Sequence, residues 1–409
     1  MEAFTLQYRK KFMSHSLLSD PRTWLALLAF CEKNIVRYVI LVISFIPGMK
    51  EISSLILPVL YVLLILSCLA KGCSFKLLEV FVVTFVILSI MGTCIIYPQN
   101  TQYIFDENNF WNSIFPCLRW FIVGLFIVPN KQTLTLLSKV SCVSVVTECL
   151  FLVLYMMPNG LLESDDMSRS YQLLPNVLLV LNYSFSKKNI ANLFFAFLSF
   201  FYILSLGTRG PIMIILAFVF LKLLSRSSLM MRKKMLFCGL LSLIVLLFYN
   251  SPLYISFLAY IMDILERHGL STRIIQFALD GTVVSYTSGR NELYDWALNR
   301  VLENPFVGYG IYGEWPWVGW SIHNMYLEIL LHFGFVGGGI LLFAIVSLVI
   351  RTYLKTKNEI AKDLILIWAS FVFIRGIFGG SYLQFPMFFL LGFCIQELRR
   401  LTHRINYSL

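Results

Sequence analysis

Charged residues are scarce in this 409-residue chain: Asp, Glu, Lys and Arg together make up 13% of it, against 58% hydrophobic residues. A soluble domain of this size needs more polar surface, so the composition excludes an ordinary soluble protein. The mean hydropathy of +0.76 indicates a chain that is solvated by lipid. The net charge of +11 does not indicate nucleic-acid binding, because Lys and Arg fall in short clusters between apolar runs.

Several motifs of soluble chemistry are absent. The sequence has no Gly-x-x-x-x-Gly-Lys-Ser/Thr loop, so ATP is not expected as an energy source. The nine cysteines include no Cys-x-x-Cys pair and none lies in residues 251–322, which argues against a zinc site and against a disulfide-stapled ectodomain. There is no Asp-x-Asp pair in a loop and no histidine cluster, so we expect no metal and no other cofactor.

Long apolar runs take the place of these motifs. About twenty apolar residues span a bilayer, and lipid-exposed backbone must be helical. The chain is therefore predicted to be an all-α polytopic membrane protein, a single membrane domain of residues 1–409 with about twelve transmembrane helices. The expected spans are residues 35–48, 52–70, 77–97, 113–129, 134–157, 171–185, 190–206, 211–225, 235–250, 325–350, 363–378 and 383–398. Segment 21–32 is expected to form an interfacial helix that leads into the first span.

The distribution of basic residues predicts the orientation. Alternate loops carry the basic residues Lys71, Lys76, Lys131, Lys187, Lys188, Arg226, Arg232, Lys233, Lys234, Arg351, Lys355, Lys357, Arg399 and Arg400. The other loops are acidic or, like residues 251–322, contain no lysine. The basic loops are expected in the cytoplasm, which places both termini there, with an uncleaved N-terminus, and puts 251–322 outside the cytoplasmic membrane.

Residues 251–322 form the only long loop and should contain an amphipathic helix. Ser288 is expected to cap a helix that runs to about Glu303 and ends at Asn304-Pro305. Its apolar stripe would comprise Leu293, Trp296, Ala297, Val301 and Leu302, and its polar face Glu292, Asp295, Asn299 and Arg300. The tryptophans that follow at 315, 317 and 320 fit a membrane interface, or alternatively a sugar-stacking surface.

Four arginines fall near the expected outer boundary: Arg119, Arg209, Arg290 and Arg375. The guanidinium group binds phosphate through two hydrogen bonds and stays charged, so together they predict a site for an anionic lipid diphosphate. Arg290 has a further advantage, because it would open a helix whose N-terminus also attracts anions. For each arginine taken alone, pairing with an acid or carbonyl, or snorkelling to the interface, is the competing interpretation.

His323 stands where the long loop re-enters the membrane. Its neutral imidazole suits a general base that accepts a proton from a sugar hydroxyl, while a hydrogen-bonded rim histidine is the competing interpretation. Asn324 is a candidate to orient this ring or to bind sugar. Glu328, within the next span, is expected to pair with Arg375 or another arginine, or to raise the basicity of His323. Glycines 334, 337, 338 and 339 are expected to permit close helix packing rather than catalysis.

Taken in order, these motifs resemble the O-antigen polymerase and ligase superfamily. The resemblance rests on Thr208-Arg209-Gly210, Ser288-Gly289-Arg290, Trp296, the run from Glu303 to Gly310, His323-Asn324 and the Gly334-x-x-Gly337 pair. It covers roughly residues 200–340. The rest of the chain is similar only in helix count and loop placement.

The resemblance implies a metal-independent membrane glycosyltransferase at the outer face of the cytoplasmic membrane. Its donor would be an undecaprenyl-diphosphate-linked oligosaccharide, with Arg209 and Arg290 on the diphosphate and His323 assisting the acceptor hydroxyl. Arg119 and Arg375 would be supporting cations, and Asn324 and Glu328 would help to bind substrate. Membrane lipid and a chain-length regulator protein are the further partners expected, and nucleic acid is not.

Three functions remain open from the sequence. The Ser-Gly-Arg opening and the His-Asn motif followed by Glu328 favour a polymerase that joins repeat units into O-antigen or a related surface polysaccharide. A ligase that transfers glycan to lipid A core is the first alternative. A repeat-unit flippase is the second, although internal repeats and mid-membrane charges, which such a transporter should show, are not evident.

Overall fold

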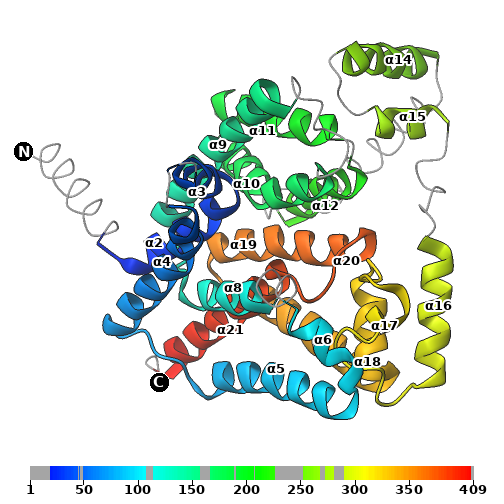
Figure 1. Cartoon of the computed structure of the whole chain (residues 1–409). Helices are drawn as coiled ribbons and strands as arrows, with labels where there is room; N and C mark the ends of the chain where they lie inside the picture. Colours follow the sequence, from blue (N-terminus) through cyan, green and yellow to red (C-terminus); the bar gives the residue numbers. More distant parts are fainter. Residues whose placement is uncertain are drawn as a thin grey trace, which may run out of the picture. The chain divides into compact units, whose positions relative to one another are not determined.

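The computed structural model describes residues 19–44, 46, 49–106, 114–156, 166–187, 190–206, 208–225, 252–267, 272–280 and 290–406. All regular structure in this part of the chain is helical, as the sequence predicts (Figure 1). The chain divides into two compact units. Unit 1 comprises residues 1–141 and 291–409, and unit 2 comprises residues 142–290.

Unit 1 holds the helices from both ends of the chain. In chain order they are α2 (Pro21–Cys31), the π-helical turn η1 (Glu32–Val36), α3 (Arg37–Ser44), α4 (Lys50–Ala70), α5 (Leu77–Ile96), the short turn η2 (Pro98–Asn100), α6 (Thr101–Ile104), α8 (Phe115–Phe126), the start of α9 (Lys131–Phe151), α16 (Arg290–Glu303), α17 (Trp315–Val318), α18 (Met325–Lys355), α19 (Glu359–Ala369), the π-helical turn η5 (Ser370–Ile374), α20 (Arg375–Phe378) and α21 (Phe385–Asn406).

The centre of unit 1 is the crossing of α8 and α21 (Figure 1). A Cβ added at Gly124 would lie 2.3 Å from the carbonyl oxygen of Phe389, and one added at Gly392 would lie 2.3 Å from that of Phe121. Only glycine allows the two backbones this close, as small residues do at helix crossings in membranes. A buried aromatic cluster surrounds the crossing, in which the Trp368 and Phe389 rings stack with centroids 4.2 Å apart.

The expected interfacial helix at 21–32 is continuous with the first expected span, and its position at a membrane surface stays a prediction. Asp20 caps α2 by accepting a hydrogen bond from the backbone N–H of Arg22, and η1 joins α2 to α3 without an interruption. Leu25 and Ala26 are at most 1% exposed, because α2 packs on α4 and α8. The buried face of α2 therefore belongs to the interior of unit 1.

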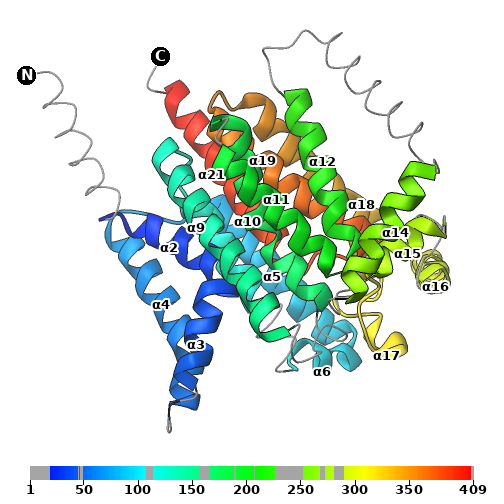
Figure 2. The ribbon, with the colours of Figure 1, turned by 90° about the horizontal axis from the view of Figure 1, so that it is seen from above.

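Unit 2 is built on three helices that pack side by side, α10 (Asp166–Lys187), α11 (Ile190–Ser205) and α12 (Arg209–Ser225) (Figure 2). It also contains residues 142–151 of α9, the π-helical turn η4 (Leu152–Met156), α14 (Pro252–Arg267) and α15 (Arg273–Leu279). Tyr202 donates a buried hydrogen bond of 3.0 Å to Glu148, which joins α11 to α9.

Eleven of the twelve expected spans overlap described helices, some of them only in part, and residues 235–250 lie outside the described part of the chain. Three helical stretches in the described part are long and apolar enough to cross a membrane: 77–96, 131–154 and 325–355. Shorter apolar helices cover 55–70, 115–126, 194–203 and 210–225. These helices support a multi-pass membrane protein.

The long segment 251–322 contains more helix than one amphipathic stretch. Besides α16 it includes α14, α15 and the one-turn α17, and the boundary between the two units falls within it, after residue 290. The predicted end of α16 at Asn304-Pro305 is confirmed, because the helix ends at Glu303. The expected cap Ser288 lies outside the described residues.

Candidate functional site

Unit 1 presents a loop, residues 304–311, that is bonded to a break in α18; we call it the motif loop. Gly334, within α18, has φ 73° and ψ 170°, which no helix contains. The carbonyl oxygens of Leu331 and His332 accept hydrogen bonds of 2.8 and 3.0 Å from the backbone N–H groups of Tyr309 and Gly310. The backbone polar groups that the break releases are thus satisfied by the loop.

Two glycines make this contact possible. A Cβ added at Gly308 would lie 2.4 Å from the backbone nitrogen of Gly334, and one added at Gly334 would lie 2.6 Å from the carbonyl carbon of Phe306. Both residues also have positive φ values, which side chains disfavour. A Cβ added at Gly338 would meet the backbone at Ile329 and Leu330. One added at Gly337 would meet only the Phe333 side chain, and one at Gly339 would meet no described neighbour, so close packing requires only part of this group.

Side chains of α5 and η2 hold the motif loop from its other side. The Tyr97 hydroxyl donates to the carbonyl oxygen of Gly308 at 2.6 Å, and the buried Asn100 amide donates to that of Tyr309 at 2.9 Å. The Asn304 amide also donates to the Gly308 carbonyl, at 2.5 Å. These bonds give the run from Asn304 to Gly310 a structural role, because it holds the N-terminal part of α18 in place.

Helix α16 packs against the same entry. Ala297 and Val301 are at most 1% exposed and form a cluster with Ile322 and Leu331, to which Leu293 and Trp296 add partly buried surface. The predicted stripe is thus confirmed at four positions. It is wrong at Leu302, which is 66% exposed because it lies one residue, about 100° of helix rotation, beyond Val301.

His323 lies at this entry and is exposed. Its φ of 59° is uncommon for a residue with a side chain and costs about 1–3 kcal/mol. The conformation is held by its backbone: its N–H donates to the Ser321 hydroxyl at 3.2 Å, and the Tyr294 hydroxyl on α16 donates to its carbonyl oxygen at 3.4 Å. Such local strain, kept by neighbouring contacts, is frequent at functional sites.

Asn324 is the N-cap of α18. Its side-chain oxygen accepts hydrogen bonds from the backbone N–H groups of Tyr326 at 3.1 Å and Leu327 at 3.2 Å. This explains why Asn follows His323, since Asn is among the best capping residues. Its side-chain oxygen is occupied by these two bonds. Only its side-chain NH₂ group could therefore bind sugar.

Glu328 does not have the partners expected from the sequence. It is 1% exposed and accepts a 2.7 Å hydrogen bond from the Ser381 hydroxyl, and no described arginine pairs with it. It lies instead with Glu314 and His332, one potential ligand atom of each within 4.8 Å of the others. His332 and Glu314 were not predicted from the sequence. The available signal was the spacing of Glu328 and His332, which lie four residues apart in an apolar helix.

Arg119 is engaged inside the bundle. Its guanidinium lies 2.6 Å from the Glu32 carboxylate and 4.4 Å from the centre of the Tyr61 ring, and Tyr61 donates a 2.5 Å hydrogen bond to the same carboxylate. Arg119 is 8% exposed and Glu32 is 2% exposed. Arg119 therefore pairs with an acid, which was the competing interpretation of this residue.

Arg375 opens α20 directly after η5 and is half-buried. Its guanidinium lies 5.5 Å from the centre of the Phe371 ring, within the range of a cation–π contact. The π-helical turn before it shifts the register of the chain, as such turns often do near functional groups. Its role as a supporting cation stays a prediction.

In unit 2, Arg209 is the first residue of α12, next to a buried hydrogen bond of 2.9 Å between the Thr208 and Ser170 hydroxyls. This bond places Arg169, in the first turns of α10, at the same end of the unit. Arg169 was not predicted as a site residue; its guanidinium stacks 4.8 Å from the Phe151 ring centre. Arg290 is the first residue of α16 and is half-buried. Whether Arg209, Arg290 and His323 converge stays a prediction.

A further arginine of α16, Arg300, is committed to its neighbours. It pairs with Glu303 at 2.7 Å and stacks 4.4 Å from the Trp317 ring centre. The hydrogen bond to Glu303 raises the Arg300 pKa, and partial burial raises the pKa of the adjacent Tyr309 above its usual value. Trp317 and Trp320 are 59% and 57% exposed, and both roles expected for these tryptophans remain open.

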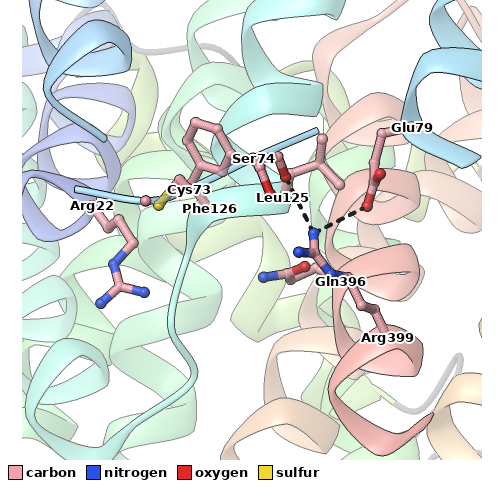
Figure 3. A pocket seen from close by; sticks show the side chains of 9 residues that line it. Arg22, Cys73, Ser74, Glu79, Leu125, Phe126, Gln396 and Arg399 are labelled. Carbon is pink, nitrogen blue, oxygen red and sulfur yellow. Dashed lines mark hydrogen bonds and ion pairs between the residues drawn. The ribbon is translucent and has the colours of Figure 1, made fainter. Parts of the chain in front are cut away.

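A cavity of about 140 Å³ lies elsewhere in unit 1, lined by Arg22, Glu79, Gln396 and Arg399 (Figure 3). Arg399 reaches the carbonyl oxygen of Ser74 and the Glu79 carboxylate at 3.3 and 3.6 Å. The cavity adjoins the start of α5, whereas Tyr97 just beyond its end bonds the motif loop. Because a helix rises about 1.5 Å per residue, the cavity is about 30 Å from that loop.

Comparison with known proteins gives one match. The model of the O-antigen ligase family matches residues 194–343, more than a third of the chain, which includes α11, α12, α14 to α17 and the first part of α18. No curated protein and no solved structure matches the chain. The matched region contains Arg209, Arg290, the motif loop and His323. The chain therefore carries a domain of the O-antigen ligase and polymerase family between residues 194 and 343.

Proposed function

We propose that this protein joins undecaprenyl-diphosphate-linked oligosaccharide repeat units into O-antigen or a related surface polysaccharide, at the outer face of the cytoplasmic membrane. The family domain at residues 194–343 is the observation that carries this proposal, because members of the family transfer lipid-linked glycans. The motif from Ser288 to Arg290 and the His323-Asn324 pair followed by Glu328 favour polymerase over ligase.

The donor diphosphate would be held by Arg209 and Arg290. Each is the first residue of a helix, of 17 and 14 residues respectively. A phosphate at such a position meets a guanidinium and also the unpaired N–H groups and positive dipole end of the helix. Arg169 lies at the same end of unit 2 as Arg209 and is a third candidate to bind the diphosphate. Arg375 would be a supporting cation.

His323 would accept the proton of the acceptor hydroxyl as that oxygen attacks the anomeric carbon of the donor. The new glycosidic bond forms while the bond to the diphosphate breaks, and undecaprenyl diphosphate leaves with the electron pair. The exposure of His323 and its backbone-held conformation support this role. A positioned general base typically increases a reaction rate by about 10²- to 10⁴-fold.

Purified protein in nanodiscs, given lipid-linked repeat unit alone, should produce a ladder of longer glycans. His323→Ala should reduce the rate by about 100-fold or more, and Arg290→Ala or Arg209→Ala should do so by a similar factor, since each removes a fixed charge from the leaving group. Arg267→Ala is the matched control, because this arginine lies in the same segment with a side chain that is 74% exposed and paired with Asp263. Full activity of the His323 and Arg290 variants would refute the site.

Ligase activity is the second candidate, because the family model that matches is the one described as O-antigen ligase. The same preparation then gives no ladder with repeat unit alone and transfers glycan only when lipid A core is added. The two acceptors, supplied separately, decide between the functions.

A further inference from the structure

Three ionisable side chains meet in the interior of unit 1: Glu314, Glu328 and His332, which we call the acid–histidine cluster. Their exposed fractions are 0%, 1% and 1%, and one nitrogen or oxygen of each lies within 4.8 Å of the others. Glu328 and His332 come from one face of α18, one turn apart, and Glu314 immediately precedes α17. The motif loop brings this last residue to the helix.

The charges in the cluster do not balance. Among the described residues, the only basic side chain paired with either carboxylate is His332, whose Nε2 lies 2.5 Å from Glu314 Oε2. Ser381, which bonds Glu328, is neutral. Glu314 Oε1 and Glu328 Oε2 are buried and have no hydrogen-bond partner in the described part of the chain. A carboxylate that stays charged in the interior without a cation beside it costs several kcal/mol, so either a proton on one of the acids or a bound cation must offset the charge.

The surroundings of His332 match those of a metal ligand. Its Nδ1 lies 2.8 Å from the Tyr382 hydroxyl, so that Nε2 faces the carboxylates. Histidines that bind metal usually use their second ring nitrogen in such a hydrogen bond, which fixes the tautomer and the ring orientation. The hydroxyl of Ser381 holds Glu328 in the same manner.

We propose that Glu314, Glu328 and His332 bind one divalent cation of the zinc class. One imidazole and two carboxylates are ligands that Zn²⁺ and Mn²⁺ accept, whereas Ca²⁺ and Mg²⁺ prefer oxygen alone. The two carboxylates and the ion sum to zero charge, which removes the imbalance. Two ligands of one Zn²⁺ at about 2.0–2.1 Å lie about 3.3 Å apart, so binding widens the His332–Glu314 contact. The ion would fasten the segment before α17 to α18.

This site departs from the expectation of no metal drawn from the sequence, and it is independent of the proposed transferase reaction. The test is therefore metal binding rather than activity. Untagged full-length protein, stripped with chelator and dialysed, is titrated with Zn²⁺ and assayed by elemental analysis. We expect one Zn²⁺ per chain, and X-ray absorption of this wild-type complex should show one imidazole nitrogen among oxygen ligands.

Glu328→Gln and His332→Gln should each weaken Zn²⁺ binding by about 100-fold or more, since each removes one of three protein ligands. Glu359→Gln is the matched control, because this side chain is 78% exposed and lies outside the cluster. Glu328→Gln retains an acceptor for Ser381, and a monodisperse elution profile with an unchanged helical spectrum verifies its fold. Substoichiometric binding by wild type, equal binding by the variants, or absorption without an imidazole ligand each overturns the proposal.

Discussion

Two of the buried clusters of ionisable side chains in the described part of unit 1 differ in charge balance. In the first, the Glu32 carboxylate meets the Arg119 guanidinium at 2.6 Å, with Tyr61 on its second oxygen. In the second, the acid–histidine cluster, the imidazole of His332 pairs with Glu314, and the Glu328 carboxylate lies within 4.8 Å of both. In the first cluster the two opposite charges cancel, and the cluster joins η1, α4 and α8. In the second, no described Lys or Arg lies beside the two carboxylates, which is why we propose that it binds a cation.

This difference changes how the arginines of a membrane protein are interpreted. Arg119 satisfied every sequence criterion for a substrate-binding cation, yet it is used within the bundle. A buried charge therefore indicates a binding site only when the charges around it do not already cancel. The largest loss of stability is expected when the pair of Glu32 and Arg119 is broken. The two later predictions test the contacts that position the acid–histidine cluster.

Arg119→Met should destabilise unit 1 by about 3–5 kcal/mol, because it leaves the Glu32 carboxylate buried without its partner. The free energy of unfolding in mixed detergent micelles is the measurement. The double variant Glu32→Gln with Arg119→Met should recover most of the loss, since no charge then remains buried. An Arg119→Met protein as stable as wild type would mean that the pair contributes nothing.

Gly334→Ala should cost about 2–4 kcal/mol, because the new Cβ meets the Phe306 backbone and the conformation is one that only glycine adopts readily. The loss should also disturb the acid–histidine cluster, whose Glu314 follows the motif loop. Gly337→Ala is the control: its Cβ would meet only Phe333, at 3.6 Å, so it should be neutral or stabilise by up to about 1 kcal/mol. Equal stabilities for the two variants would contradict the account of the break.

Tyr382→Phe should have the smallest effect, a loss of about 1 kcal/mol, because it removes one buried hydrogen bond to His332 and leaves the ring packing. Under the zinc proposal it also weakens Zn²⁺ binding by about 10-fold, through the orientation of the imidazole. Phe393→Leu, a substitution in the buried core away from the cluster, should lower stability without this change in affinity. If both variants bind Zn²⁺ equally, Tyr382 does not position His332.

The sequence predicted the features that depend on local chemistry. Apolar runs located the helices, and Asn304-Pro305 located the end of α16, because hydrophobic length and backbone restriction are properties of neighbouring residues. The family motifs located His323 at the start of α18. Even the missed helices α14 and α15 lie in a segment whose mixed polarity gives no span-length signal.

Partners that are distant in the sequence could not be predicted in the same way. Glu32 and Arg119 are 87 residues apart, and Ser381 reaches Glu328 across 53 residues. Nothing in a single sequence says which carboxylate will meet which cation, so Glu328 was assigned an arginine that the fold does not give it. The strained backbone of His323 is likewise set by Tyr294 and Ser321 through three-dimensional contacts.

The break at Gly334 has a mechanical consequence. Leu331 and His332 before it, and Val336 just after it, share backbone hydrogen bonds with the motif loop. The twenty-one residues after the break continue as an uninterrupted, mostly apolar helical rod. A change in bilayer thickness that tilts this rod would be absorbed at the one residue whose torsion angles are already non-helical. His323, Glu314 and Glu328 would then keep their places relative to α16, because they all lie before the break.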